Sequence, residues 1–240
     1  MKIIDESGKE RDFFFEMSKY AGHLYKSHVE RHLAIYDLYK KTYELPGSVA
    51  EFGLYNGSTF FFLARLIEIF NRSNFEVHES SSHHLYGFDT FEGIANLTDN
   101  DHTEIYTPKR QSSGFKLNNN FFLSDFEWFK ENNCSIAKRL HIVKGDAAVS
   151  FPDFIKRNPG VRFRFVLMDM DIFEPTDAVL NSIFDYMTPG GIIAFDEYGF
   201  PEWPGETIAV DRFIRNRNLE LKGIPWACAP SAYCVVQNRK

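Results

Sequence analysis

Cysteine is scarce in this sequence: its 240 residues include three, and none of them forms a CxxC pair. We therefore expect reduced thiols and a cytoplasmic protein. Long apolar runs are also missing, since no stretch approaches the roughly 20 residues needed to cross a bilayer. The first residues, MKIIDESGKERDFF, are too charged for a signal peptide. These absences predict a soluble protein with no membrane partner.

Basic residues are in the minority, with 27 Lys and Arg against 33 Asp and Glu and a net charge of −6. Non-specific binding to nucleic acid needs a basic surface, so we expect no nucleic-acid partner. The GxxxxGKS phosphate loop, the GxGxxG dinucleotide fingerprint and a Ser/His/Asp nucleophile pattern are absent as well. A NAD-dependent dehydrogenase is therefore disfavoured. Aromatic residues are abundant (25 Phe, 11 Tyr and 3 Trp), which favours an apolar pocket or a subunit interface.

Strand-like and helix-like segments alternate along most of the chain. Single helices between strands predict an α/β fold with a mostly parallel sheet covered on both faces. Two apolar segments close the chain without a clear helix between them, which predicts an antiparallel C-terminal hairpin. The expected strands before that hairpin are 48–54, 85–91, 140–146, 162–171 and 191–199, and the expected helices are 60–70, 121–133, 149–157, 175–187 and 207–216.

The N-terminal part of the chain is helical in pattern. Residues 28–45 repeat apolar positions at steps of three and four, and this predicts one largely apolar helix face. We divide the chain into an N-terminal helical segment, residues 1–45, packed on a core domain, residues 46–240. The face is expected to comprise Val29, Leu33, Tyr36, Lys40 and Tyr43.

A glycine-containing turn follows the first core strand, with Glu51, Gly53 and Gly57 at fixed spacing. Glycine lets the backbone approach a ligand closely, because no Cβ intrudes. The E/D-x-G-x-x-x-G spacing is the one seen in class I methyltransferases, where the loop wraps the methionine part of S-adenosylmethionine. An ordinary tight turn before a helix, capped by Ser58 or Thr59, is the alternative. The loop positions expected to bind the cofactor are Glu51, Gly53, Tyr55, Asn56, Gly57 and Ser58.

Two later strand ends carry further cofactor candidates. Asp89 in FDTFEG can accept both ribose hydroxyls with its two oxygens, or it can cap a helix. Gly145 and Asp146 are expected beside the adenine, although Asp146 serves equally well as a helix cap. Thr90 and Phe91 complete the segment expected to contact the cofactor.

Acidic residues gather at the ends of two more strands, as Asp169 and Asp171 in MDMDIFEPT and as Asp196 and Glu197 in FDEYG. Ligands of open α/β sheets bind at these carboxyl ends. Converging carboxylates repel one another unless a cation neutralises them. Oxygen-only ligands favour Mg²⁺, or Mn²⁺, over zinc. A turn-capping Asp171 and a solvated Glu197 are the alternative.

The sequence resembles the macrocin and mycinamicin O-methyltransferase family, which methylates sugar hydroxyls. The resemblance runs from about Ile35 to Ile214 and includes PGSVAEFGLYNGST, LYGFDTFEGI, VLMDMDIFEPT, TPGGIIAFDEYG and PGE-x-x-AVDRF. Where family members usually carry a second Asp, this chain has Glu197. Asn56 stands where a basic residue is more typical.

This resemblance implies a seven-stranded Rossmann-like fold, S-adenosylmethionine and Mg²⁺ (or Mn²⁺) as cofactors, and a sugar or glycoside acceptor. By position, Asp169, Asp196 and Glu197 would bind the metal, and Asp169 would also be the candidate general base. The long polar loop from Gly93 to Asn120 would act as a lid. A homodimer or larger homo-oligomer is expected. A catechol-type O-methyltransferase and a non-catalytic cofactor-binding or scaffold protein remain the competing hypotheses.

Overall fold

The computed structural model describes residues 2–4, 8, 10–12, 26–77, 83–94, 97–104 and 119–237. Most of the polar loop expected to form a lid, and most of the first 25 residues, therefore lie outside the described residues. Among the residues that are described, no helix is long and apolar enough to cross a membrane.

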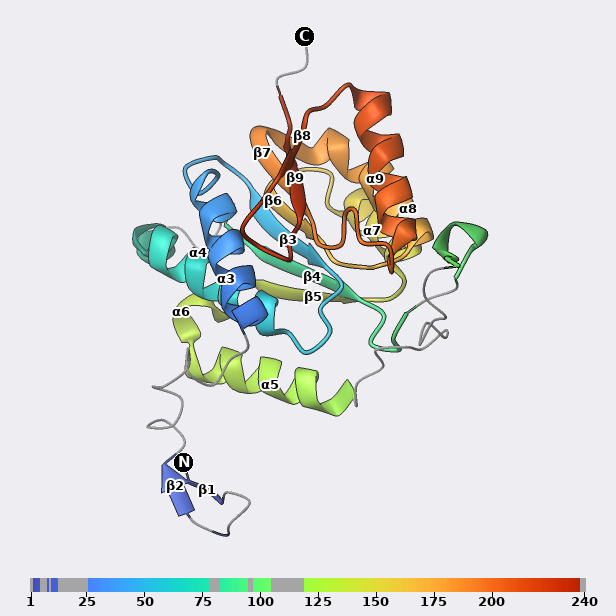
Figure 1. Ribbon diagram of the computed structural model, residues 1–240. Helices are drawn as coiled ribbons and strands as arrows, with labels where there is room; N and C mark the ends of the chain where they lie inside the picture. Colours follow the sequence, from blue (N-terminus) through green and yellow to red (C-terminus); the bar gives the residue numbers. More distant parts are fainter. Residues whose placement is uncertain are drawn as a thin grey trace.

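A seven-stranded sheet forms the centre of the molecule, with the strand order β5-β4-β3-β6-β7-β9-β8 (Figure 1). The first five strands of this order are parallel, and β9 pairs antiparallel with both β7 and β8. The predicted α/β class, the mostly parallel sheet and the C-terminal hairpin are therefore confirmed. The strands are β3 (Ser48–Phe52), β4 (Leu85–Asp89), β5 (Leu140–Lys144), β6 (Phe163–Met168), β7 (Met187–Phe195), β8 (Leu221–Gly223) and β9 (Ala232–Val235).

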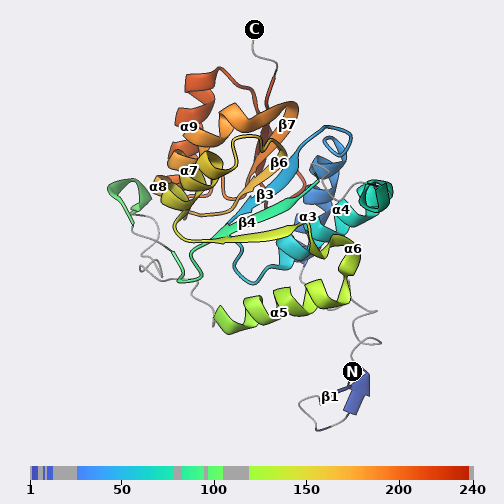
Figure 2. The same cartoon turned by 180° about the vertical axis from the view of Figure 1, so that it is seen from behind.

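Helices cover both faces of the sheet, as Figures 1 and 2 show from opposite sides. One face carries α3 (Lys26–Lys40), α4 (Ser58–Val77), α5 (Asn119–Asn132) and α6 (Cys134–Ala137), and the other carries α7 (Ala147–Arg157), α8 (Phe173–Ile183) and α9 (Pro204–Arg217). Short 3₁₀ turns span Asp99–Asp101 and Phe184–Tyr186, and a separate antiparallel pair joins β1 (Lys2–Ile4) to β2 (Glu10–Asp12).

Side-chain alternation along the strands decides which residues meet which helices. Val49, Phe165 and Ile192 belong to the core under α3 and α4, whereas Ala50 and Val166 face the helices on the other side. Side chains two residues apart share a face of a strand. This period puts Glu51, within β3, on the α3 face, and continued one residue past β6 and β7 it puts Asp169 and Asp196 there as well.

Two sequence predictions need correction. Helix α3 buries Ala34, Ile35, Leu38 and Tyr39, while Leu33, on the predicted apolar face, is 52% exposed. Tyrosine and leucine recur all around this helix, so the pattern alone left two possible faces. The predicted bounds of the strand over 191–199 are also wrong, because β7 spans Met187–Phe195. The division of the chain at residue 45 stays a prediction.

Candidate functional site

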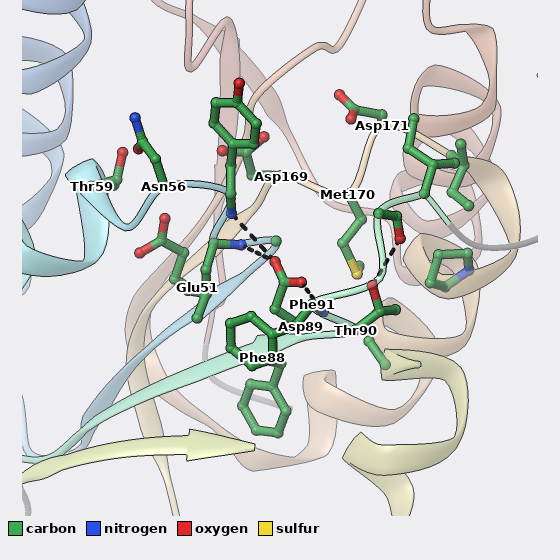
Figure 3. Close-up of a pocket in the computed structure, with 18 of the residues that line it drawn as sticks. Glu51, Asn56, Thr59, Phe88, Asp89, Thr90, Phe91, Asp169, Met170 and Asp171 are labelled. Atoms are coloured by element: carbon green, nitrogen blue, oxygen red, sulfur yellow. Dashed lines mark hydrogen bonds between the residues drawn. The ribbon is translucent and has the colours of Figure 1, made fainter. Parts of the chain in front are cut away.

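A cavity of about 490 Å³ lies at the carboxyl ends of β3, β4 and β6 (Figure 3). This volume is in the range of small-molecule sites. The wall includes Glu51, Gly53, Tyr55, Asn56, Ser58, Asp89, Thr90, Phe91, Gly145, Asp146, Asp169 and Glu197. Of the predicted site residues, Gly57 and Asp196 lie just outside this lining. The sheet thus gathers residues that are far apart in the sequence.

The glycines of the β3–α4 turn are required by close contacts. Gly53 has a φ of +86°, and a Cβ there would lie 1.7 Å from the carbonyl oxygen of Asp169. At Gly57, with a φ of +79°, a Cβ would lie 2.4 Å from the ring of Phe122 on α5. The turn therefore packs directly against the end of β6 on one side and against α5 on the other. No residue with a side chain fits at either position without displacement.

Asn56 closes a turn just before helix α4. Its Oδ1 accepts a hydrogen bond from the backbone N–H of Ser58 at 3.0 Å. Ser58, one of the two expected caps, is therefore the first residue of the helix and the donor of this bond. Thr59 has another role, because its hydroxyl accepts a hydrogen bond from Arg31 Nε at 3.0 Å.

Asp89 lies below the turn between β3 and α4, residues 53–57, which we call the glycine turn (Figure 3). Its Oδ2 accepts from the N–H groups of Leu54 at 2.6 Å and Tyr55 at 3.3 Å, and its Oδ1 accepts from that of Phe91 at 2.6 Å. Two carboxylate oxygens offer about four acceptor positions, so three N–H donors leave room for one more. Asp89 thus orders the turn and still presents an acceptor to the cavity.

Asp146 caps the helix on the other side of the cavity. Its Oδ1 accepts from the N–H of Ala148 at 2.9 Å at the start of α7. The capping alternative for this residue is confirmed, and its predicted contact with adenine stays a prediction. The neighbouring turn is closed by Thr90, whose hydroxyl donates to the carbonyl of Gly93 at 2.8 Å.

Three acids converge at the far end of the cavity. Asp169, Asp171 and Glu197 each offer an oxygen within 4.8 Å of the other two. Asp171 has a φ of +65°, an unusual backbone conformation for a residue with a side chain. The family resemblance predicts Asp196, and not Asp171, as the third metal ligand. That assignment stays a prediction, but the arrangement here puts Asp171 in the converging group.

Arg31, which the sequence reading missed, reaches the acids from α3. Its Nη1 donates to Asp196 and its Nη2 donates to Asp169 Oδ2 at 2.5 Å. Burial alone would lower the pKa of Arg31, but the attraction of Asp196 and Asp169 outweighs it and raises the pKa. The guanidinium is therefore charged, and it balances part of the acidic set.

Burial raises the pKa of four carboxyl groups well above their ordinary values. For Glu51 and Asp169 the next causes are the neighbouring acids, opposed by the charge of Arg31. For Glu197 and the fully buried Glu206, repulsion from Asp196 adds to burial. A further cation at these acids would oppose this upward shift, because a nearby positive charge favours the ionised form of a carboxyl group.

Three of these acids have a buried oxygen without a hydrogen-bond partner among the described residues: Glu51 Oε2, Glu197 Oε2 and Glu206 Oε2. Such an atom costs free energy unless a ligand satisfies it. Glu51 is 1% exposed and lines the cavity, where it fits a cationic amino group. Glu197 belongs to an oxygen-only set that fits a hard divalent cation. Both predicted cofactors are therefore compatible with the residues present.

Sequence reasoning also missed Glu206, His28 and His32. Glu206 Oε1 accepts from the N–H of Glu197 at 3.0 Å and so supports the acidic group from behind. His28 and His32 line the cavity from α3. The signal that could have found Arg31 is its spacing: it stands three and four residues before Ala34 and Ile35, on the face that the helix buries.

Comparison with known proteins agrees with this geometry. The model of the macrocin O-methyltransferase family (TylF) matches residues 34–229. The crystal structure of CalS11, a calicheamicin methyltransferase, is 27% identical, with 92% of this chain and 86% of that chain covered and a TM-score of 0.80. An apo structure of CalS11, described as a TDP-rhamnose 3′-O-methyltransferase, is 25% identical over 95% and 87% of the two chains, with a TM-score of 0.74.

More distant structures share the fold alone. The O-methyltransferase NovP is 16% identical, with 88% of this chain and 81% of that chain covered and a TM-score of 0.66. Among curated protein sequences, none matches the chain. The predicted seven-stranded Rossmann-like fold and the family resemblance are confirmed by these likenesses.

Proposed function

This chain belongs to the macrocin O-methyltransferase (TylF) family, and we propose that it transfers a methyl group from S-adenosylmethionine to a hydroxyl of a sugar or glycoside, assisted by a divalent cation. The observation that carries this proposal is that the glycine turn, Asp89 and the converging acids share one cavity. The description of CalS11 as a TDP-rhamnose 3′-O-methyltransferase supports the choice of a sugar acceptor.

The methyl donor fits the half of the cavity that the glycine turn encloses. Glu51 would pair with the amino group of the methionine part, which would satisfy its buried Oε2. Asp89 would accept a ribose hydroxyl at its remaining acceptor position while its other bonds hold the turn. Phe91 and Met170 provide apolar surface in the same wall.

The acceptor would lie between the donor and the acids. Methyl transfer forms an oxygen–carbon bond as the carbon–sulfur bond breaks, the electron pair stays on sulfur, and the hydroxyl proton must go to a base. Asp169 is the candidate for this base because it stands at the end of β6, between the glycine turn and the other acids. The protein supplies alignment of oxygen, carbon and sulfur, which is a large part of such rate enhancements.

A divalent cation, when bound, would make the acceptor hydroxyl more acidic. Asp169, Asp171 and Glu197 would hold it, and Glu206 would hold the backbone of Glu197 in place. The sequence-based set with Asp196 differs from this one in a single residue. Substituting Asp171 and Asp196 separately, and measuring the binding of a divalent cation by each variant, therefore shows which of the two sets holds the cation.

We also propose a homo-oligomer in the cytoplasm. Leu33 and Tyr36 of α3 and Ile69 of α4 are exposed apolar or aromatic side chains on adjacent helices. If these side chains form one continuous patch, that patch would be the contact surface between subunits.

Calorimetric titration with S-adenosylmethionine and S-adenosylhomocysteine, with and without Mg²⁺, tests the proposal. We expect micromolar binding to the wild type and at least about tenfold weaker binding to Asp89→Asn, since the amide keeps the shape of the side chain but loses the charge-assisted acceptors. Asp153→Asn, at an exposed position of α7, is the control and should bind as the wild type does. If neither compound binds to the wild type under any metal condition, the methyltransferase proposal fails.

A further inference from the structure

Arg31 connects helix α3 to Asp169 and Asp196, which follow the ends of β6 and β7. It stands on the same face of α3 as Ala34, Ile35 and Leu38, which are fully buried in the core. Rotation of the helix to remove Arg31 would expose that apolar face, so the guanidinium is held toward the acids by the packing of the whole helix.

All three guanidinium nitrogens of Arg31 donate hydrogen bonds. Nη1 donates to Asp196, Nη2 to Asp169 at 2.5 Å, and Nε to the hydroxyl of Thr59 at 3.0 Å. The Arg31 side chain is 18% exposed and that of Asp196 is 5% exposed. A planar guanidinium is suited to bridging two carboxylates in this way, and water screens such a largely buried pair only weakly.

The acids that hold Arg31 overlap with those that would hold a cation. Asp169 belongs to the converging group with Asp171 and Glu197, and Asp196 belongs to the set that the family resemblance assigns. A divalent cation and a guanidinium at the same carboxylates repel each other, and they also compete for the same lone pairs. Each of the two possible ligand sets therefore contains at least one carboxylate that Arg31 contacts.

We propose that Arg31 is a resident counter-cation that competes with the divalent cation for the carboxylates that it holds, and so weakens binding of the cation. The inference rests on the proposed function for the identity of the competitor, a divalent cation. The buried oxygen Oε2 of Glu197 supports it, because this member of the converging group has no hydrogen-bond partner for that atom among the described residues even with Arg31 in place.

The two contacts of Arg31 are unequal. The Asp169 side chain is 24% exposed and shared with the converging acids, whereas the Asp196 side chain is nearly buried. Asp169 is therefore the contact that an incoming cation exchanges first. Asp196 keeps its contact with the guanidinium. Helix α3 therefore keeps its position while Arg31 loses its contact with Asp169.

Titration of the full-length protein with Mn²⁺, followed by the electron paramagnetic resonance signal of free Mn²⁺, tests this competition. Arg31→Gln should bind Mn²⁺ at least about tenfold more tightly than the wild type, because a positive charge next to the dication is removed. Arg31→Lys, which keeps the charge but not the fork, should bind a few-fold more tightly. Arg65→Gln is the control, since Arg65 on α4 pairs with Glu68 at 2.8 Å and is 44% exposed.

Thermal unfolding of the same samples provides a second readout. In EDTA, Arg31→Gln should unfold at a lower temperature than the wild type, and Mn²⁺ should raise its unfolding temperature by more. Equal or weaker Mn²⁺ binding by the folded Arg31 variants would overturn the competition. Calorimetry with S-adenosylmethionine separates the two proposals: if the donor binds but no variant binds Mn²⁺, the competition fails and methyl transfer stands.

Discussion

Gly53 is the residue at which an added Cβ should lower stability most. Its φ of +86° is unfavourable for any side chain, and the Cβ would collide with backbone at the end of β6, not with a movable side chain. We expect Gly53→Ala to lower the free energy of unfolding by about 3 kcal/mol or more and to weaken S-adenosylmethionine binding. Urea denaturation and calorimetry measure the two effects.

Gly160 provides the matched control for this substitution. A Cβ at Gly160 would meet no atom within 4 Å, so Gly160→Ala should change the free energy of unfolding by less than about 1 kcal/mol. A Gly53→Ala protein as stable as Gly160→Ala would contradict the close packing of the glycine turn on β6.

Individual site residues were predictable where the residue type and its place at a strand end determine the chemistry. Glu51, Asp89 and Asp169 follow from that logic, and all three line the cavity. The start of α4 was not predictable in the same way. Asn, Ser and Thr all favour helix starts, so the sequence could not show that Asn56 would accept a hydrogen bond from Ser58.

The edge of the sheet formed by β4 and β5 should make stability depend on pH. Burial, followed by the nearby charges of Arg164 for His83 and of His84 for His141, lowers the pKa of both histidines to about 4. Their ordinary value is 6.5, so between 6.5 and about 4 the unfolded chain binds more protons than the folded one. Their contribution to stability is present above 6.5 and is lost as the pH falls toward 4.

His141→Gln should therefore lose less stability than the wild type when the pH falls through this range. Urea midpoints measured at several pH values give the comparison, and His102→Gln, at an exposed position, serves as the control. The buried acids with raised pKa values change stability in the opposite sense, but they are common to all three proteins. Identical pH dependence in the three would show that His141 is not held neutral by the fold.

Most strands and helices of the core were predictable to within a few residues because their apolar patterns are strong, but α4 runs on to Val77 and the short helix α6 was not predicted. Helix α3 is a further exception, since aromatic and aliphatic residues surround it and only its neighbours decide which of them are buried. The start of β7 was missed for a related reason. Thr188, Pro189 and the following glycines favour a turn locally, but pairing with β6 makes Met187 the first residue of the strand.

The order of the sheet follows from simple units: strands joined by single helices, then a closing hairpin. The contact between Arg31 and Asp169 does not, because the two residues are 138 positions apart and no local pattern joins them. It arises only when α3 packs across the sheet, with β6 and β7 ending beneath the helix. The arrangement of charge around the cavity is thus a property of the assembled fold.

Transfer of an isotopically labelled methyl group tests the central claim most directly. The protein would be incubated with methyl-labelled S-adenosylmethionine, Mg²⁺ and a panel of nucleotide sugars, glycosides and catechols, and the products analysed by mass spectrometry. We predict label on a sugar hydroxyl, and loss of that product in Asp169→Asn. Label on catechols with none on any sugar, or an unchanged product yield from Asp169→Asn, would contradict the proposed acceptor or the proposed role of Asp169.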